Sequence, residues 1–246
     1  MIYRPSEEGG LMFVERPSRG TVRHASSVFG TSREGIQLTV WLPAERKPEI
    51  LVIGSIHGDE AETTVVLSDA LRTVSRGGLR NAAVLCANPD GILRGTRGNA
   101  IGVDLNRNFP TANWAPDPIY YKTRRADPRD IELSPGAHPG SEPETEALLA
   151  LLERLQPRAV VSLHSALACI DDADGSPLGK WLAERSGLPL EEDIGYPTPG
   201  SFGSWAGEHG LNLVTYELEA ASPYELKDRH APVMIELLTG QVDLGG

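Results

Sequence analysis

Gly54-Ser-Ile-His-Gly-Asp-Glu60 follows the short apolar run Ile50–Ile53 and sets an imidazole and a carboxylate three residues apart. Residues i and i+3 of a helical turn face the same way, so His57 and Glu60 can hold one ion between them. The apolar run predicts a strand, and open α/β sheets build their sites where strands end. This segment therefore predicts both an α/β fold and a metal site.

Two later segments supply the rest of a ligand set. The apolar run of residues 159–163 ends at His164, and the run of residues 211–216 is followed by Glu217. Each feature alone has a simpler explanation, because a histidine after a strand is commonly a hydrogen-bonded structural residue. Together they give two histidines, one glutamate and a spare carboxylate at three strand ends. Two histidines, a glutamate and an open position form the ligand set of a hydrolytic zinc site.

The size and charge of the chain restrict its class. Its 246 residues, 40% hydrophobic and 23% charged, suit one α/β domain that spans residues 1–246. The net charge of −11 argues against nucleic acid or an anionic membrane as a partner. We expect a cytoplasmic protein, because the N-terminus lacks the apolar core of a signal peptide and Cys86 and Cys169 form no disulfide framework. The oligomeric state is open, a homodimer included.

Strand and helix patterns alternate along the chain. Strands are predicted at residues 36–41, 50–53, 82–87, 159–163 and 211–218, and helices at residues 60–74, 144–155, 177–186 and 223–238. Ser141 is the expected N-cap of the second helix, and Pro232 is expected to kink or break the last. The alternation predicts a single-domain mixed β-sheet with helices on both faces. Residues 89–139 show little periodicity, and we expect them to be ordered by their own contacts and to be functional.

Gly102-Val-Asp-Leu-Asn-Arg-Asn-Phe-Pro110 is the second informative segment. A guanidinium fork binds both oxygens of a carboxylate, and a neighbouring amide donates a further hydrogen bond. The pair Asn106-Arg107 is therefore a candidate clamp for a substrate carboxylate. Taken alone, the motif is better explained as a surface turn, and the nearby metal ligands favour the clamp.

The set of motifs, in this order, resembles the zinc metallocarboxypeptidases, and the resemblance covers residues 36–218. It implies that His57, Glu60 and His164 bind Zn²⁺. It also implies roles for residues around the metal: Glu217 as general base, Arg97 at the scissile carbonyl, Asn106 and Arg107 at the terminal carboxylate, and Tyr196 as a mobile cover over the substrate. Arg94 is an alternative to Arg97, and Glu219 is an alternative to Glu217.

Further segments resemble the branch of that family that trims recycled cell-wall peptides. They are Ala87-Asn-Pro-Asp-Gly91, Gly102 to Pro110, Ala112-Asn-Trp114, Gly140-Ser-Glu-Pro-Glu-Thr145, Leu167-Ala-Cys-Ile170, and Gly195-Tyr196 with Pro199-Gly-Ser-Phe-Gly-Ser-Trp205. This resemblance implies hydrolysis of the γ-D-glutamyl–meso-diaminopimelate bond in the murein tripeptide L-Ala-γ-D-Glu-meso-diaminopimelate. Small residues Gly203 and Ser204 lie where the family lines its side-chain pocket. Asp171 and Asp172 are candidate ammonium partners, although a solvated turn is the better explanation of both.

Two other classes of function compete with this expectation. A zinc-dependent deacylase or amidohydrolase that acts on N-acyl amino acids can share the metal ligands. The Asn106-Arg107 clamp and the segment around Tyr196 favour a peptide C-terminus instead. A zinc-binding or peptide-binding module without activity needs no general base and no oxyanion donor, so Glu217 and Arg97 argue against it.

Overall fold

The central element is a mixed eight-stranded sheet. The computed structural model describes residues 20–122, 130–193, 195–242 and 244. In spatial order the strands are β1 (Ala25–Thr31), β2 (Gln37–Leu42), β4 (Ala82–Val84), β3 (Ile50–Ile53), β7 (Ala159–Ser165), β10 (Asn212–Leu218), β8 (Cys169–Asp171) and β9 (Leu190–Glu191). Strands β4, β3, β7 and β10 are parallel to one another, and β8 is parallel to β9. The pairs β1–β2, β2–β4 and β8–β10 are antiparallel.

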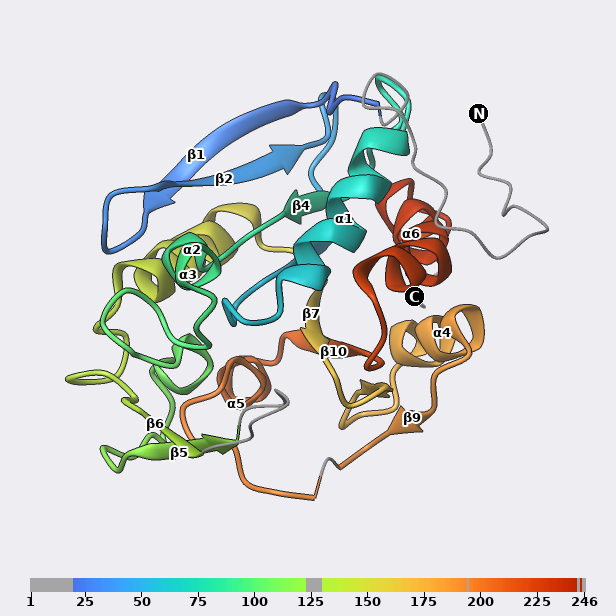
Figure 1. Ribbon diagram of the computed structural model, residues 1–246. Helices are drawn as coiled ribbons and strands as arrows, with labels where there is room; N and C mark the ends of the chain where they lie inside the picture. Colours follow the sequence, from blue (N-terminus) through green and yellow to red (C-terminus); the bar gives the residue numbers. More distant parts are fainter. Residues whose placement is uncertain (1–19, 123–129, 194, 243, 245–246) are drawn as a thin grey trace.

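Helices cover both faces of the sheet, as predicted. Figure 1 shows α1 (Ala61–Thr73), α4 (Pro177–Ser186) and α6 (Pro223–Leu238) grouped together, and α6 contacts both of the others. Their apolar side chains form one core with the sheet. Helices α3 (Pro143–Leu155) and α5 (Phe202–Glu208) contribute Leu148 and Phe202 to a second core on the opposite face. No helix among the described residues is long and apolar enough to cross a membrane.

The two cores explain why the central strands are continuous apolar runs. Every residue of β3 is fully buried, with Ile50 and Val52 in the first core and Leu51 and Ile53 in the second. A strand that is covered by helices on both faces has no solvent-facing side, so it shows no polar alternation. The centre of the sheet is therefore buried and apolar, and polar groups lie where its strands end.

The connections place a site at the ends of β3, β7 and β10. Strand β3 continues through α1 to β4 on one side, while β7 pairs with β10 on the other. The strand order thus reverses between β3 and β7. Parallel α/β sheets bind ligands at such a point, outside the carboxyl ends of the strands.

Most of the predicted elements are confirmed, and some boundaries are corrected. Strand β4 ends at Val84, because the chain turns there towards α2 (Pro89–Arg94). Helix α3 is preceded by Glu142 and has no side-chain cap, so the prediction of Ser141 as N-cap is wrong. Helix α6 continues through Pro232, so the predicted break is wrong, and the kink stays a prediction.

The elements missed from sequence have weak patterns. Strand β1 is mostly exposed and has no apolar run, and β8 and β9 are very short. Residues 89–139 contain α2, the short helix η2 (Leu105–Arg107) and a separate pair of strands, β5 (Ile119–Lys122) and β6 (Asp130–Leu133). Residues 123–129 of that stretch lie outside the described residues.

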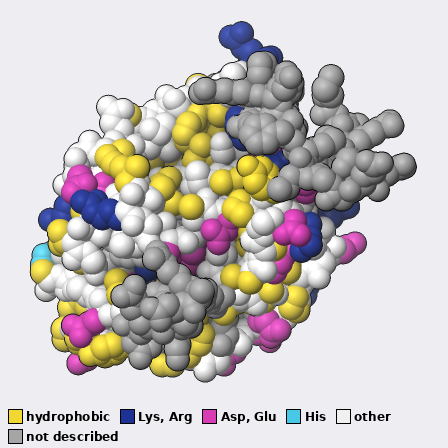
Figure 2. Space-filling model, in the orientation of Figure 1, with side chains coloured by type: hydrophobic (Ala, Val, Ile, Leu, Met, Phe, Trp, Pro, Cys, Tyr) yellow, Lys and Arg dark blue, Asp and Glu magenta, His cyan; other side chains and the backbone are white. Residues whose placement is uncertain are grey.

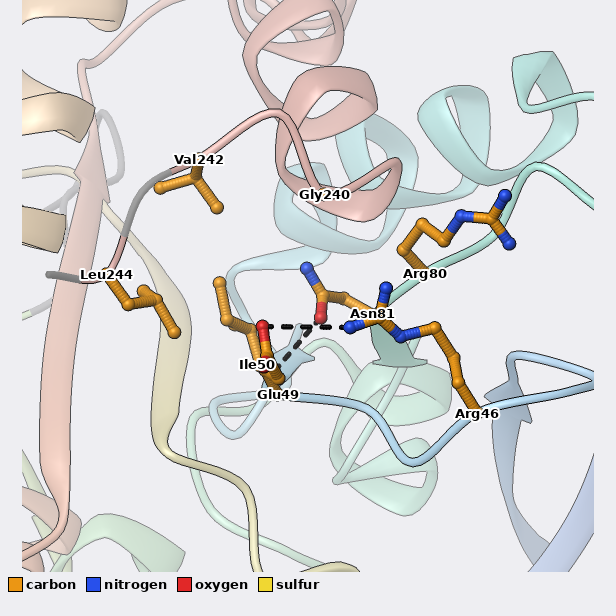
Figure 3. A pocket seen from close by; sticks show the side chains of 8 residues that line it. All are labelled: Arg46, Glu49, Ile50, Arg80, Asn81, Gly240, Val242 and Leu244. Carbon is orange, nitrogen blue, oxygen red and sulfur yellow. Dashed lines mark hydrogen bonds and ion pairs between the residues drawn. The ribbon is translucent and has the colours of Figure 1, made fainter. Parts of the chain in front are cut away.

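A buried amide joins the sheet to its helical cover at the other end of the strands. Asn81 accepts a hydrogen bond from the Ile50 amide at 3.1 Å and donates one to the Leu237 carbonyl at 2.7 Å. The same residue lines the small hollow in Figure 3, together with Arg46, Glu49, Arg80 and the chain after α6. Because this hollow faces the amino ends of β3 and β4, it is separate from the site at the carboxyl ends.

The surface carries charge in small groups. On the face shown in Figure 2, basic side chains lie apart from one another among acidic and apolar ones.

Candidate metal centre and active site

The turn after β3 is held firmly against α1. Ser55 has a φ of +49°, a left-handed conformation that is uncommon outside glycine and reverses the chain sharply. Its amide donates to Thr63 Oγ1 at 2.9 Å, and its own hydroxyl lies 2.8 Å from both Thr63 Oγ1 and Thr64 Oγ1. These bonds fix the position from which His57 projects.

His57 and Glu60 lie in a turn before the helix rather than within a helical turn. The Glu60 amide donates to the His57 carbonyl at 3.4 Å, and Glu60 is the residue that precedes α1. Its side chain forms no capping hydrogen bond with the helix. The turn has the same three-residue spacing as the predicted helical turn, so both side chains still face one point.

The turn before α2 packs against the turn that carries His57. Asn88 Nδ2 donates to the carbonyls of Ile56 and Arg97, and Asn88 Oδ1 accepts from the Gly91 amide at the start of α2. Gly58 packs directly on Gly91, and a β-carbon at either position would overlap neighbouring atoms. The glycine within the motif is therefore required by the close approach of two backbones.

Three buried side chains converge on one point. Glu60 Oε1 lies 2.8 Å from His57 Nδ1, and Glu60 Oε2 lies 3.0 Å from His164 Nδ1. The two imidazole nitrogens are 3.1 Å apart, and the exposed fractions of the three residues are 2–4%. Ligands at zinc bond lengths of about 2.0–2.1 Å in a tetrahedron are about 3.3 Å apart. Among the described residues, these three are the group that could hold a metal ion.

The outer nitrogens of both imidazoles face partners of the kind that orient metal ligands. His164 Nε2 lies 3.1 Å from Ser162 Oγ. His57 Nε2 lies 3.3 Å from Asp104 Oδ1, and it is buried without an aligned hydrogen bond. A carboxylate at this position favours the tautomer that carries its proton on Nε2, which leaves Nδ1 free for a metal. The residues present therefore fit a zinc ion.

The electrostatics of the centre favour a cation. Burial and the Arg97 guanidinium lower the pKa of His57, but the carboxylates of Glu60 and Asp104 outweigh them and raise it to about 9. Carboxylates surrounded by low dielectric stabilise positive charge strongly. A divalent ion bound at this point would take the place of that proton.

Arg97 belongs to the same network. Its Nε donates to Asp104 Oδ2 at 2.9 Å, and its terminal nitrogen lies 3.4 Å from Glu60 Oε1. Its guanidinium carbon is 4.6 Å from the centre of the Tyr121 ring. Arg94, the alternative, instead pairs with Glu34 at the surface. Arg94 therefore lies outside the site.

The Asn106-Arg107 pair forms part of a packed turn. Asp104 Oδ1 accepts from the Asn106 amide at 2.9 Å and caps η2, and Asn106 Oδ1 accepts from the Phe202 amide at 2.8 Å. This bond orients the Asn106 side-chain amide, and among the described residues no hydrogen bond engages its NH₂ group. Arg107 donates to the Asn106 carbonyl at 2.7 Å, and burial lowers the pKa of its guanidinium. The simple surface turn does not describe this segment.

Glu217 and Glu219 have different surroundings. Glu217 stands opposite His164 in the parallel pairing of β10 with β7, is 9% exposed, and accepts a hydrogen bond from the Leu167 amide at 3.3 Å. Burial raises the pKa of Glu217. Glu219 lies beyond the end of β10 and pairs with Arg229 and His230 of α6. The strand ends before the two-residue alternation reaches Glu219, so Glu219 is not in the site.

Tyr196 lies at the edge of the site, with 50% of its surface exposed. Burial and the Glu217 carboxylate raise its pKa, whereas Arg107 and Arg97 lower it, which places Tyr196 within electrostatic range of all three groups. Gly203 and Ser204 lie in α5, and the Ser204 hydroxyl donates to the Thr198 carbonyl.

Sequence analysis missed two residues of the network. Asp104 precedes Asn106 by two residues within the quoted motif, and an acidic residue so close to the clamp is a signal that was available. Tyr121 lies on β5, in a stretch without periodicity, and its contact with Arg97 is produced by the fold alone.

Comparison with known proteins agrees with this geometry. Residues 17–170 match the model of the zinc carboxypeptidase family, and the chain belongs to that family of hydrolases. It is 45% identical to murein peptide amidase A of Escherichia coli K12, over 92% of this chain and 96% of the relative. It is 37% identical to murein peptide amidase A of Vibrio campbellii, over 98% of both chains. The crystal structure of a murein-tripeptide amidase from Escherichia coli O157 matches with a TM-score of 0.86 and 43% identity, over 92% of this chain and 96% of that one.

The contact between Gly58 and Gly91 gives a test of how the metal turn is held. Gly58→Ala places a β-carbon against the Gly91 backbone, and we expect a loss of about 1–3 kcal/mol in the free energy of unfolding. Gly207→Ala is the matched control, because Gly207 lies in α5 with open space around it. Thermal unfolding of the two variants measures the difference. Equal melting temperatures for both would show that the two backbones are not in close contact.

Proposed function

We propose that this chain is a zinc-dependent peptidase that hydrolyses the γ-D-glutamyl–meso-diaminopimelate bond of the murein tripeptide, in recycling or degradation of cell-wall peptides. The observation that carries the proposal is the convergence of His57, Glu60 and His164, with the Glu217 carboxylate beside them. The full-length similarity to murein peptide amidases supports this substrate. Residues 1–246 as one catalytic domain and a cytoplasmic location remain predictions.

His57, Glu60 and His164 would hold the zinc. When bound, zinc supplies a Lewis acid that lowers the pKa of water and polarises a carbonyl group. Asp104 and Ser162 would keep the two imidazoles in the tautomer and orientation that this binding needs.

Glu217 would act as the general base. A carboxylate of raised pKa accepts a proton from the attacking water and can give it up again to the departing amine. The Leu167 amide donates to Glu217 Oε2, so one oxygen is held and the other is left for proton transfer. Glu217 would thus carry the proton from the water to the diaminopimelate nitrogen.

Arg97 would stabilise the negative charge that develops on the carbonyl oxygen. Its guanidinium is already fixed by Asp104 and by the Tyr121 ring, so little reorganisation is needed during the reaction. Asn106 and Arg107 would bind the carboxylate next to the scissile bond, and Tyr196 would cover the bound peptide. These groups give positive charge at the site of a chain whose net charge is −11.

Product analysis by mass spectrometry tests the function directly. We expect free meso-diaminopimelate from the murein tripeptide with the metal-loaded protein, and none after a chelator has removed the metal. Release of the acid from N-acyl amino acids, with the tripeptide left intact, would favour the deacylase instead.

The metal assignment predicts the zinc content of variants. His164→Ala removes one of three ligands, so zinc bound after dialysis should fall well below one per chain. His138→Ala is the control, because it removes an exposed imidazole and should leave the zinc content unchanged. Elemental analysis measures both. Stoichiometric, equally tight zinc in His164→Ala would remove His164 from the ligand set.

The base assignment predicts a loss confined to turnover. Glu217→Gln keeps the size of the side chain but cannot take a proton, so kcat should fall on the order of 10²-fold or more while zinc is retained. Glu219→Gln is the comparison and should keep most of its activity, because Glu219 pairs with α6. The opposite ranking of the two variants would assign the base to Glu219.

Substitution of Arg107 and substitution of Arg97 should change different kinetic parameters. Arg107→Ala loses an interaction present in both ground and transition states, at a cost of about 2–4 kcal/mol, and much of the loss should appear in KM. Arg97→Ala should lower mainly kcat, because its partner charge exists only in the transition state.

Amidation of the diaminopimelate α-carboxylate should reproduce the Arg107→Ala defect in the unmodified enzyme. Equal cleavage of the amidated and free peptides would mean that no C-terminal carboxylate is bound.

A further inference from the structure

A second acidic residue, Asp171, lies on the same face of the sheet as Glu217. In the antiparallel pairing of β8 with β10, Cys169 stands opposite Glu217 and Asp171 opposite Thr215. Side chains alternate along a strand, so these four share one face. The intervening residues, Ile170 and Tyr216, are fully buried in the core on the other face.

Asp171 and its neighbour Asp172 differ in their hydrogen bonding. Among the described residues, no hydrogen bond or ion pair reaches the Asp171 carboxylate. Its neighbour Asp172 is 2% exposed and accepts from the amide and hydroxyl of Ser176 at 2.8 and 2.7 Å, where α4 begins. Of the two acidic residues that follow His164, Asp172 is therefore structural and Asp171 is available.

The surroundings of Asp171 favour a positive ligand. Burial, and then the Glu217 carboxylate, raise the pKa of Asp171 to about 6, and Asp172 and Asp193 add to the effect. His164 opposes the shift. Tyr196 lies within electrostatic range of both Asp171 and Arg107. An acidic group and a basic group therefore both lie near this tyrosine.

We propose that Asp171 binds the side-chain ammonium group of the amino acid that is released, and so selects diaminopimelate at that position. This assignment rests on the proposed function. Arg107 would hold the α-carboxylate beside the scissile nitrogen while Asp171 meets the far end of the side chain.

The distances along the sheet suit this ligand. Asp171 lies two residues along the strands from the level of Glu217, which is about 7 Å at the usual rise per residue. The four carbon–carbon bonds between the two amine-bearing carbons of diaminopimelate span about 5 Å at ordinary bond lengths, and the nitrogen adds more. A side chain that ends in a carboxylate alone would meet Asp171 and Glu217 with like charge.

The test compares two peptides: the murein tripeptide, and the same tripeptide acetylated on the distal amine of diaminopimelate. In the wild-type enzyme, acetylation should lower kcat/KM about 10- to 100-fold, which is the effect of losing one charged hydrogen bond. Asp171→Asn should show a similar loss with the unmodified tripeptide, mostly in KM, and little further loss on acetylation. Zinc content and melting temperature establish that the variant is folded.

Glu191→Gln is the matched control. Glu191 is exposed and pairs with Asp171 across β8 and β9, so the substitution removes the same charge one strand away. The control should keep the wild-type ratio between the two peptides. A wild-type ratio in Asp171→Asn, or an equal change in both variants, would overturn a direct contact with the ammonium group.

Binding of free meso-diaminopimelate separates this proposal from the proposed function. Calorimetry should show binding about 10-fold or more weaker in zinc-loaded Asp171→Asn than in the zinc-loaded wild type. If the wild type fails to cleave the tripeptide but this difference in binding is found, the proposed function fails and the role of Asp171 stands. Equal binding by the two proteins would overturn the role of Asp171, whatever the turnover.

Discussion

A carboxylate and two imidazoles, none more than 4% exposed, meet at one point beyond the ends of β3 and β7. Burial of ionisable groups is costly unless each is paired, and Glu60 pairs with both His57 and His164. The turn after β3, the start of α1 and the end of β7 must all be in place before this contact forms. The rest of the site is arranged around it.

Asp104 and Arg97 extend the contact into a network of charges. Asp104 faces His57, bonds Arg97 and caps the helix that carries Asn106 and Arg107. One buried carboxylate thus connects His57 of the candidate metal site with Arg97 and with the turn that carries Asn106 and Arg107. The Arg97 guanidinium is therefore held in place by a buried acid next to the metal ligands rather than left at the surface.

The predictions from sequence succeeded where a single short segment carries the information. The strand Ile50–Ile53 and the helices Pro177–Ser186 and Pro223–Leu238 have the predicted bounds, because their apolar patterns and caps are local. The prediction that Ser141 caps α3 is wrong, because its hydroxyl forms hydrogen bonds with Glu142 and Asn108 instead of with the helix backbone. The predicted break at Pro232 is wrong: α6 continues through this residue and packs against α1 and α4, with Ala231 and Val233 on either side of the proline buried in the core.

The sequence by itself determined the kinds of group at the site and their local spacing: His57 with Glu60, Asn106 with Arg107, and the apolar strands that precede His164 and Glu217. Spacing acts over a few residues, so it could define each pair but not the distances between pairs. Only the tertiary structure decided that Arg97 rather than Arg94 reaches Glu60, that Glu217 rather than Glu219 faces His164, and that Asp171 shares a sheet face with Glu217. Those choices depend on strand register and on where strands end, which arise from the packing of segments far apart in the chain.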